Sequence, residues 1–216
     1  MRLTIIGLIS MVLLPVMIGC GDAEQPQVAS LGGGNPNDPV DGDGDGNIDE
    51  VPDGVNDLFT PEQLEAFRSA GLPLYFGDEP PTVDGGFGAD SLQIVYDDLD
   101  LSLVIVAYLF EFSEQTAAGR IGIAYQGGAD SSSDNNAFIA GSEGCFSVYA
   151  DISGYSAVDD CEYRRPTIYS ACLEGGHLHP FVFGFVITDT DGDCSQTLPV
   201  GHSRIINESD GYAMRQ

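Results

Sequence analysis

The chain has 216 residues, 43% of them apolar, and a formal net charge of -27 from seven basic residues, all arginine, against 34 acidic ones. An acidic surface of this kind repels phosphate backbones, which excludes nucleic acid as a partner, and it attracts divalent cations. The length suits one compact domain with a tether better than two large domains.

The first element is an apolar run that ends in Met17-Ile18-Gly19-Cys20. A cysteine after a small residue, at the end of a short export signal, resembles a bacterial lipobox, although Met17 and Ile18 replace the residues usual at its first two positions. The resemblance implies that residues 1–19 are a signal peptide and that Cys20 carries the lipid. Plain secretion is the alternative, but Met17 is a poor small residue for that cleavage. The run is too short and too interrupted for a membrane-spanning helix.

The same resemblance predicts the cellular location of the mature chain. It implies a protein of the cell envelope, held at the membrane through its lipid anchor. Gly21, rather than an aspartate, follows Cys20, which favours the outer membrane by resemblance to the sorting rules of bacterial lipoproteins. The face of that membrane stays open.

Residues 20–57 show no hydrophobic periodicity and are rich in Gly, Pro, Asn and Asp, which predicts a disordered acidic tether. Within it lies a run with the ligand spacing of the front half of a calcium loop. Its expected ligands are Asp41, Asp43, Asp45, the carbonyl of Asn47, and Asp49. Because Pro52 stands where an EF-hand has its closing glutamate, the run resembles the Asp-x-Asp-x-Asp-Gly repeats of thrombospondin type 3 segments instead. We predict weak Ca²⁺ binding, with a solvated linker as the alternative.

Residues 58–90 are expected to form a short helix followed by a Pro-rich segment. Thr60 is a good N-cap, Pro61 suits the first helical position, and Gln63 completes a capping box. Gly71 is expected to end the helix. The apolar face consists of Phe59, Leu64 and Phe67. Such a face is too narrow to form a core by itself.

From residue 91 to 216 the pattern is that of β-strands, including a run at 103–112 that is apolar on both faces. Rows expected to share a face are Leu92, Ile94 and Tyr96; Ile121, Ile123 and Tyr125; Phe146, Val148, Ala150 and Ile152; and Phe181, Phe183, Phe185 and Ile187. Turn-rich stretches such as 126–135 separate the runs. The sequence therefore predicts a mainly all-β domain of seven or eight antiparallel strands, as a lipocalin-like barrel or a sandwich.

Two short motifs carry a further resemblance. They are Gly77-Asp78-Glu79-Pro80-Pro81-Thr82-Val83-Asp84-Gly85, and Leu198-Pro199-Val200-Gly201 followed by Arg204 and Asp210-Gly211. In these the chain resembles a group of uncharacterised exported or lipid-anchored proteins of bacteria such as myxobacteria, which share a short helix, a Gly-x-x-Pro-Pro-x-apolar-x-Gly segment and a run of strands. The resemblance covers residues 57–213. It implies a fold and a cellular location, but no activity.

Four cysteines remain once Cys20 is assigned to the lipid, which suits two disulfides in an oxidising compartment. They are Cys145, Cys161, Cys172 and Cys194. Four cysteines allow three pairings. We expect Cys145–Cys161 with Cys172–Cys194, because two strands folded back about Ser153-Gly154 would bring the first pair opposite each other.

Histidines offer little catalytic chemistry. His177 and His179 have a spacing that metal sites use, but no carboxylate follows at a suitable distance, and exposed turn residues are the better interpretation. Asp189-Thr190-Asp191-Gly192-Asp193 echoes the tether motif, with a polar turn as the main interpretation and Ca²⁺ binding as the second.

Carboxylate pairs carry no prediction in so acidic a chain, as with Asp97 beside Asp98 or Glu111 near Glu114. No nucleophile elbow, zinc-protease helix or phosphate-binding glycine loop occurs in the sequence. The leading hypothesis is therefore a non-enzymatic surface or binding domain on a calcium-sensitive stalk, with another envelope protein as one candidate partner. The alternative is a lipocalin-like carrier of a small apolar ligand, for which an internal cavity is needed. A hydrolase or metal-dependent enzyme comes third.

Overall fold

The structure is a computed structural model. It describes residues 51–99, 107–128, 130–156, 160–191, 194 and 199–216. The predicted signal peptide, Cys20 and the calcium run at 41–49 lie outside these residues. Among the helices that the structure describes, none is long and apolar enough to cross a membrane.

The described residues form two short helical segments and twelve strands. The helical segments are the 3-10 turn η1 (Val55–Asp57) and α1 (Pro61–Ser69). The strands are β1 (Gly85–Ala89), β2 (Leu92–Asp97), β3 (Tyr108–Ser113), β4 (Arg120–Gly127), β5 (Asp130–Ser142), β6 (Cys145–Ser156), β7 (Cys161–Glu174), β8 (His177–Leu178), β9 (Val182–Val186), β10 (Asp189–Asp191), β11 (Ser203–Glu208) and β12 (Met214–Arg215).

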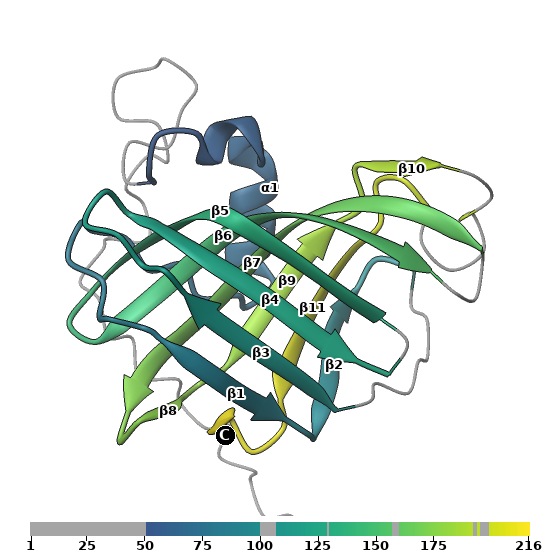
Figure 1. Cartoon of the computed structure of the whole chain (residues 1–216). Helices are drawn as coiled ribbons and strands as arrows, with labels where there is room; N and C mark the ends of the chain where they lie inside the picture. The colour runs from purple at the N-terminus through teal and green to yellow at the C-terminus, as the bar shows by residue number, and fades with distance from the viewer. Residues whose placement is uncertain (1–50, 100–106, 129, 157–159, 192–193, 195–198) are drawn as a thin grey trace, which may run out of the picture. The chain divides into compact units, whose positions relative to one another are not determined.

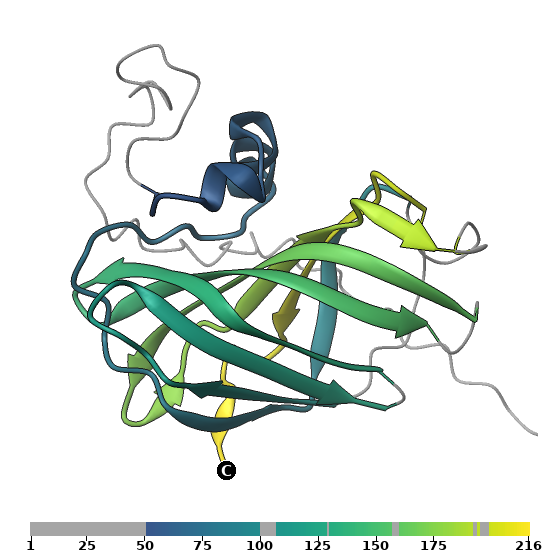
Figure 2. The same cartoon turned by 45° about the horizontal axis from the view of Figure 1, so that its top comes forward.

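The strands build one antiparallel sheet. Ten of them follow the order β12-β1-β3-β4-β5-β6-β7-β9-β11-β2, and β8 and β10 pair with β7 beside this path. Figures 1 and 2 show the sheet curled into a half-barrel, with α1 on its outer side. The prediction of an antiparallel all-β fold with one short helix is confirmed. The strands outnumber the seven or eight expected, and the first of them, β1, already begins at Gly85.

The inner face of the half-barrel is packed with aromatic rings. The ring of Phe110 on β3 lies 5.7 Å from that of Tyr169 on β7 and 5.5 Å from that of Phe183 on β9. These strands are far apart in the sheet order, so the rings meet because the sheet curls around them. All four predicted rows contribute to this core. The exception within them is Tyr96, which is 39% exposed, because β2 bulges where it pairs with β11.

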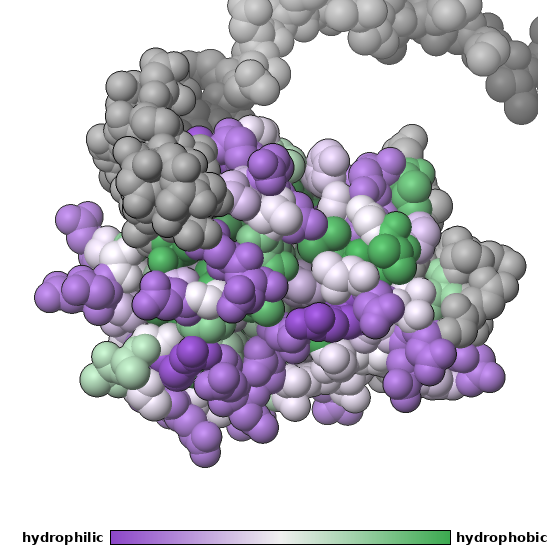
Figure 3. All heavy atoms as spheres, turned by 90° about the horizontal axis from the view of Figure 1, so that it is seen from above, coloured by the Kyte–Doolittle hydropathy of each residue, from purple (hydrophilic) through white to green (hydrophobic). Residues whose placement is uncertain are grey.

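The outer face carries a second, smaller core beneath α1. The capping box forms as predicted: the backbone N–H of Gln63 donates to the Thr60 hydroxyl, and the Gln63 side chain accepts from the Thr60 N–H. Phe59 and Phe67 pack edge to face at 6.1 Å, and Phe59 reaches Tyr149 of β6 at 6.5 Å. The helix therefore covers the outside of the sheet and not an opening of the barrel. Around it, hydrophobic and hydrophilic surface alternate in small patches (Figure 3).

Strand β5 corrects the expectation of a long turn at 126–135. Strand β4 extends to Gly127 and β5 already begins at Asp130, so most of this stretch is extended. Serine, asparagine and aspartate are poor strand formers, but here the neighbouring strand supplies partners: Ser131 pairs with Gln126 and Asp134 with Ile123. Pairing across the sheet outweighs the local preference.

The disulfide pairing differs from the expected one. The bridges are Cys145–Cys172 and Cys161–Cys194. Strands β6 and β7 form a long hairpin in which Cys145 and Cys172 are direct partners. The predicted turn at Ser153-Gly154 is wrong, because β6 continues through these residues to Ser156 and pairs with β7 along its whole length.

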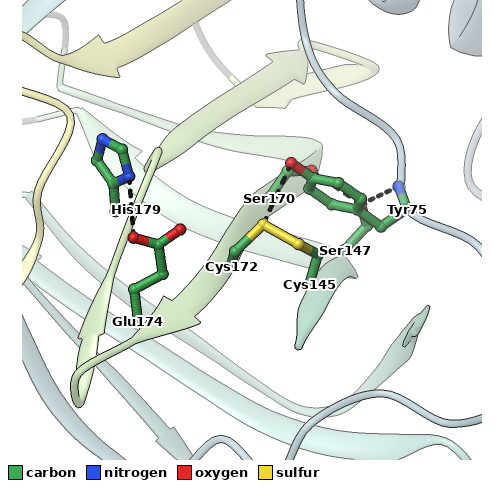
Figure 4. Close-up of a disulfide and its surroundings, with 7 residues drawn as sticks. All are labelled: Tyr75, Cys145, Ser147, Ser170, Cys172, Glu174 and His179. Carbon is green, nitrogen blue, oxygen red and sulfur yellow. Dashed lines mark hydrogen bonds and ion pairs between the residues drawn. A yellow bond between two sulfur atoms is a disulfide. The ribbon is translucent and has the colours of Figure 1, made fainter. Parts of the chain in front are cut away.

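The first bridge is tied to neighbouring segments, as Figure 4 shows. The Tyr75 hydroxyl lies 3.5 Å from the sulfur of Cys172, and the backbone N–H of Tyr75 donates to the Ser147 hydroxyl at 2.9 Å. Ser147 and Ser170 share a buried hydrogen bond across the hairpin. The Pro-rich segment after α1 is thereby attached to the centre of the sheet.

Candidate functional site

Polar side chains gather at one end of the inner face, where β3, β5 and β7 begin and where β2 and β4 end. The antiparallel order brings these strand ends together although they lie far apart in sequence. Two groups occur there. The Asp130 cluster consists of Tyr108, Tyr125, Asp130, Tyr163 and Arg165, and the His202 cluster consists of Asp97, Asp98, His202 and Arg204.

Asp130 is the acceptor at the centre of its cluster. The hydroxyls of Tyr163 and Tyr125 donate to its Oδ1 at 2.8 and 3.0 Å, and the hydroxyl of Tyr108 donates to its Oδ2 at 3.3 Å. The guanidinium of Arg165 lies 3.5 Å from the same Oδ2. A carboxylate with three phenol donors and a cation beside it is well compensated for its partial burial.

Arg165 is a buried cation held between aromatic faces. Its guanidinium carbon lies 5.0 Å from the ring centroid of Tyr125, 5.2 Å from that of Tyr163 and 4.8 Å from that of Phe185. These are cation–π distances. Its Nε has no hydrogen-bond partner among the described residues.

Burial sets the protonation of the three phenols. Burial, and then the negative charge of Asp130, raises the pKa of Tyr108 to about 12. Burial also raises the pKa values of Tyr125 and Tyr163, although Arg165 partly opposes the change. All three hydroxyls therefore stay protonated at neutral pH, where they can donate hydrogen bonds but cannot act as phenolate nucleophiles.

Two glycines make room for these tyrosines. A Cβ atom on Gly127 would lie 2.6 Å from the ring of Tyr108, and one on Gly154 would lie 2.4 Å from the hydroxyl of Tyr163. Each ring therefore lies across a neighbouring strand at a position where only glycine fits.

The His202 cluster is built on the adjacent strands β2 and β11. The Nδ1 of His202 donates to Asp98 Oδ1 at 2.5 Å, and the imidazole is fully buried. The guanidinium of Arg204 lies 2.6 Å from Asp97 Oδ2, and both side chains are almost completely buried. Although burial opposes the effect, hydrogen bonds from the Leu99 N–H and Arg204 lower the pKa of Asp97 below its usual value.

Phe185 lies between the two clusters. It faces the Arg165 guanidinium on one side, and its ring centroid lies 6.3 Å from that of His202. The Nε2 of His202, like the Nε of Arg165, is buried and has no hydrogen-bond partner among the described residues. The two clusters thus form one polar band across the end of an otherwise apolar interior.

The geometry of the His202 cluster suits a hydrogen bond better than a metal ion. Ligand atoms of Asp97, Asp98 and His202 lie within 4.8 Å of one another. However, an Nδ1 to Oδ1 distance of 2.5 Å is that of a hydrogen bond, whereas two ligands about 2.1 Å from one tetrahedral ion lie more than about 3 Å apart. Arg204 already neutralises Asp97. The arrangement therefore fits a hydrogen bond better than a bound cation.

The two histidines with metal-like spacing have separate partners. His177 Nδ1 accepts the backbone N–H of Arg215 at 3.2 Å. The ring of His179 stacks on that of Tyr212 at 4.0 Å, and its Nδ1 lies 3.6 Å from Glu174 (Figure 4). Both side chains are half-buried, and each helps to fix the C-terminal segment to the hairpin β7–β8.

The second aspartate motif is a strand where the structure describes it. Asp189–Asp191 forms β10, with Asp189 opposite Arg164 and Asp191 opposite Glu162. The predicted polar turn is therefore wrong for these three residues, because pairing with β7 extends them. Residues 192–193 lie outside the described part of the chain.

Sequence reasoning missed both clusters. Asp97 and Asp98 were an ordinary acidic pair by sequence, and only the pairing of β2 with β11 brings them to His202 and Arg204. One signal was present: Arg165 stands between Tyr163 and Thr167 in a run whose alternate residues face inward. An arginine at such a position predicts a buried charge with a nearby carboxylate.

Comparison with known protein families, with curated proteins and with solved structures finds no match for this chain.

Proposed function

We propose that this chain is a lipid-anchored protein of the cell envelope whose half-barrel is a non-enzymatic binding domain on an acidic tether. The observation that carries the proposal is the disulfide arrangement, because the two bridges use all four cysteines that follow Cys20. Disulfides persist in oxidising compartments outside the cytoplasm. Cys20 is then the one cysteine left to receive a lipid.

Two further features support a location in the cell envelope. Gly21 follows the lipid-bearing residue, and this favours the outer membrane. The resemblance of residues 57–213 to exported bacterial proteins agrees with the same location. The weak Ca²⁺ site of the tether, at Asp41 to Asp49, belongs to this proposal and stays a prediction.

A binding role accounts for the inner face better than catalysis does. The phenols of the Asp130 cluster remain protonated, Asp97 is paired with Arg204, and the His202 imidazole is fully buried. None of these groups offers a reactive atom to a substrate in solution. They support a rigid domain that presents its outer surface and grooves.

The carrier of a small apolar ligand is the second candidate, favoured by the curled sheet. Two observations weigh against it. Aromatic rings on the inner face lie 4.9 to 6.1 Å from their neighbours, as in a filled core. The helix also packs on the outer face, so it does not guard an opening.

Mass spectrometry of the native protein tests the anchor. We expect the mature chain to begin at Cys20, with a diacylglyceryl group on its sulfur and a further acyl chain on its amino group. The variant Cys20→Ser should lose the label from radioactive palmitate. A chain that retains residues 1–19, or that starts elsewhere without lipid, would overturn the proposal.

The same sample separates the two binding roles. Organic extraction of the purified protein, followed by mass spectrometry, should release only lipids that are also present in a detergent blank. A stoichiometric apolar compound that rebinds to the delipidated protein would favour the carrier function. It would contradict the proposal of a binding domain with a filled interior.

A further inference from the structure

A groove of about 870 Å³ opens on the surface between the Pro-rich segment and the β3–β4 turn. Its accessible apolar lining residues include Phe76, Pro80, Ala117 and Ala118, which we call the floor. The carboxylates of Asp78 and Glu79, the two acidic residues that line the groove, form what we call its rim. Both are exposed, and neither has a hydrogen-bond or ion-pair partner among the described residues.

The walls of the groove are fixed by hydrogen bonds. Gln115 accepts the backbone N–H of Val83 at 2.8 Å and donates to the carbonyl of Pro81 at 3.0 Å. The same Pro-rich segment is also held to β5, because the N–H of Gly141 donates to the carbonyl of Gly77 at 3.0 Å. A groove built in this way exists before a partner arrives, so binding costs little conformational entropy.

Charge and shape together define what the groove accepts. The floor favours an apolar side chain, and two uncompensated carboxylates favour a cation beside it. The net charge of -27 raises the local concentration of basic partners and repels acidic ones. An open groove also suits a chain segment that enters and leaves it better than an enclosed small molecule.

We propose that this groove, which we call the Phe76 groove, docks a segment of another protein in which an apolar side chain lies next to a lysine or arginine. The apolar side chain contacts the floor at Phe76 and Pro80, and the basic group pairs with Asp78 and Glu79. The inference rests on the proposed binding role, and it names the class of partner. It does not depend on the lipid anchor, which the mass of the N-terminal peptide tests separately.

The test uses the full mature chain, purified in detergent, and three fluorescent tetrapeptides. The probe is Leu-Lys-Leu-Arg. The peptide Ser-Lys-Ser-Arg has the same charge without the apolar side chains, and Leu-Glu-Leu-Asp has the apolar side chains with the opposite charge. Fluorescence anisotropy should show saturable binding of the probe, with an affinity at least about tenfold higher than that of either control peptide. Only the probe can both pack apolar side chains on the floor and pair basic groups with the rim carboxylates.

Matched variants locate the binding. Asp78→Asn with Glu79→Gln removes two rim charges and should weaken probe binding about three- to tenfold, the range expected for two exposed ion pairs. Asp189→Asn with Asp191→Asn removes the same charge from a separate groove of about 510 Å³, and it should change the affinity less than twofold. All four positions are exposed, so the variants should keep the melting temperature of the parent.

Three outcomes would overturn the proposal. Equal weakening by both double variants would mean that the acidic surface attracts the probe without a defined site. Equal binding of Ser-Lys-Ser-Arg would remove the role of the apolar floor. Binding that begins only after deletion of residues 21–50 would make the chain's own tether the occupant.

Discussion

The ring of Phe110 on β3 lies 4.9 Å from the ring of Phe181, which immediately precedes β9. In the hydrogen-bonded order of the sheet, four strands, β4, β5, β6 and β7, lie between β3 and β9. This contact is possible only because the sheet curls until its inner face meets itself. The aromatic core therefore both fills the half-barrel and maintains its curvature.

Replacing Phe110 with alanine should lower the free energy of unfolding by about 3 to 5 kcal/mol, the usual cost of a large cavity at a buried phenylalanine. The neighbouring Leu109 is 41% exposed and provides the control, since Leu109→Ala should cost less than about 1 kcal/mol. Urea unfolding followed by circular dichroism measures both. Equal losses in the two variants would contradict a filled interior.

Non-reducing proteolysis and mass spectrometry should find peptides that join Cys145 to Cys172 and Cys161 to Cys194. Peptides that join Cys145 to Cys161 would contradict the hairpin register. Each bridge closes a loop of similar length, with sequence separations of 27 and 33 residues. Replacing either pair by alanine should therefore cost a similar amount, about 2 to 5 kcal/mol.

The Asp130 cluster should make the domain sensitive to alkaline pH. The pKa of Tyr108, about 12 in the folded chain, lies above the ordinary value of about 10. Its stabilising contribution is therefore complete below pH 10 and is lost as the pH rises towards 12.

Urea unfolding at pH 9, 10, 11 and 12 should show a smaller decline in stability for Tyr108→Phe than for the parent. The difference between the two curves isolates Tyr108, because Tyr125 and Tyr163 titrate in both proteins. Parallel curves over this range would show that the Tyr108 hydroxyl is not shifted.

Two arginines provide a matched test of buried and exposed ion pairs. Arg204 and Asp97 are only 6% and 5% exposed at their side chains, whereas Arg164 and Asp151 are 49% and 35% exposed. Arg204→Met leaves a buried carboxylate without its cation and should cost about 3 to 5 kcal/mol. Arg164→Met should cost no more than about 1 kcal/mol. Similar melting temperatures for the two variants would contradict the burial of the His202 cluster.

Elements that are determined by residues close together in the sequence could be predicted. Thr60 and Gln63 are three positions apart, so the start of α1 follows from local chemistry. The inward rows on β4, β6 and β9 follow from the period of two along a strand. The long strand β5 could not be predicted, since its polar residues are extended by pairing with β4.

The candidate site could not be predicted, because it depends on residues that are far apart in the sequence. Asp130 meets Arg165 across 35 residues of chain, and Asp98 meets His202 across 104. No local period links such residues, and in a chain with 34 acidic side chains the partners of one arginine cannot be selected by sequence.

The sequence by itself determined the β class, the capped helix and an even set of cysteines for bridging, because these follow from composition and short-range periodicity. Tertiary structure alone decided which cysteines pair, which charges are buried and where the Phe76 groove opens. The physical reason is strand register: one set of cross-strand hydrogen bonds fixes which residues lie opposite each other, and the curl of the sheet then brings distant strands into contact.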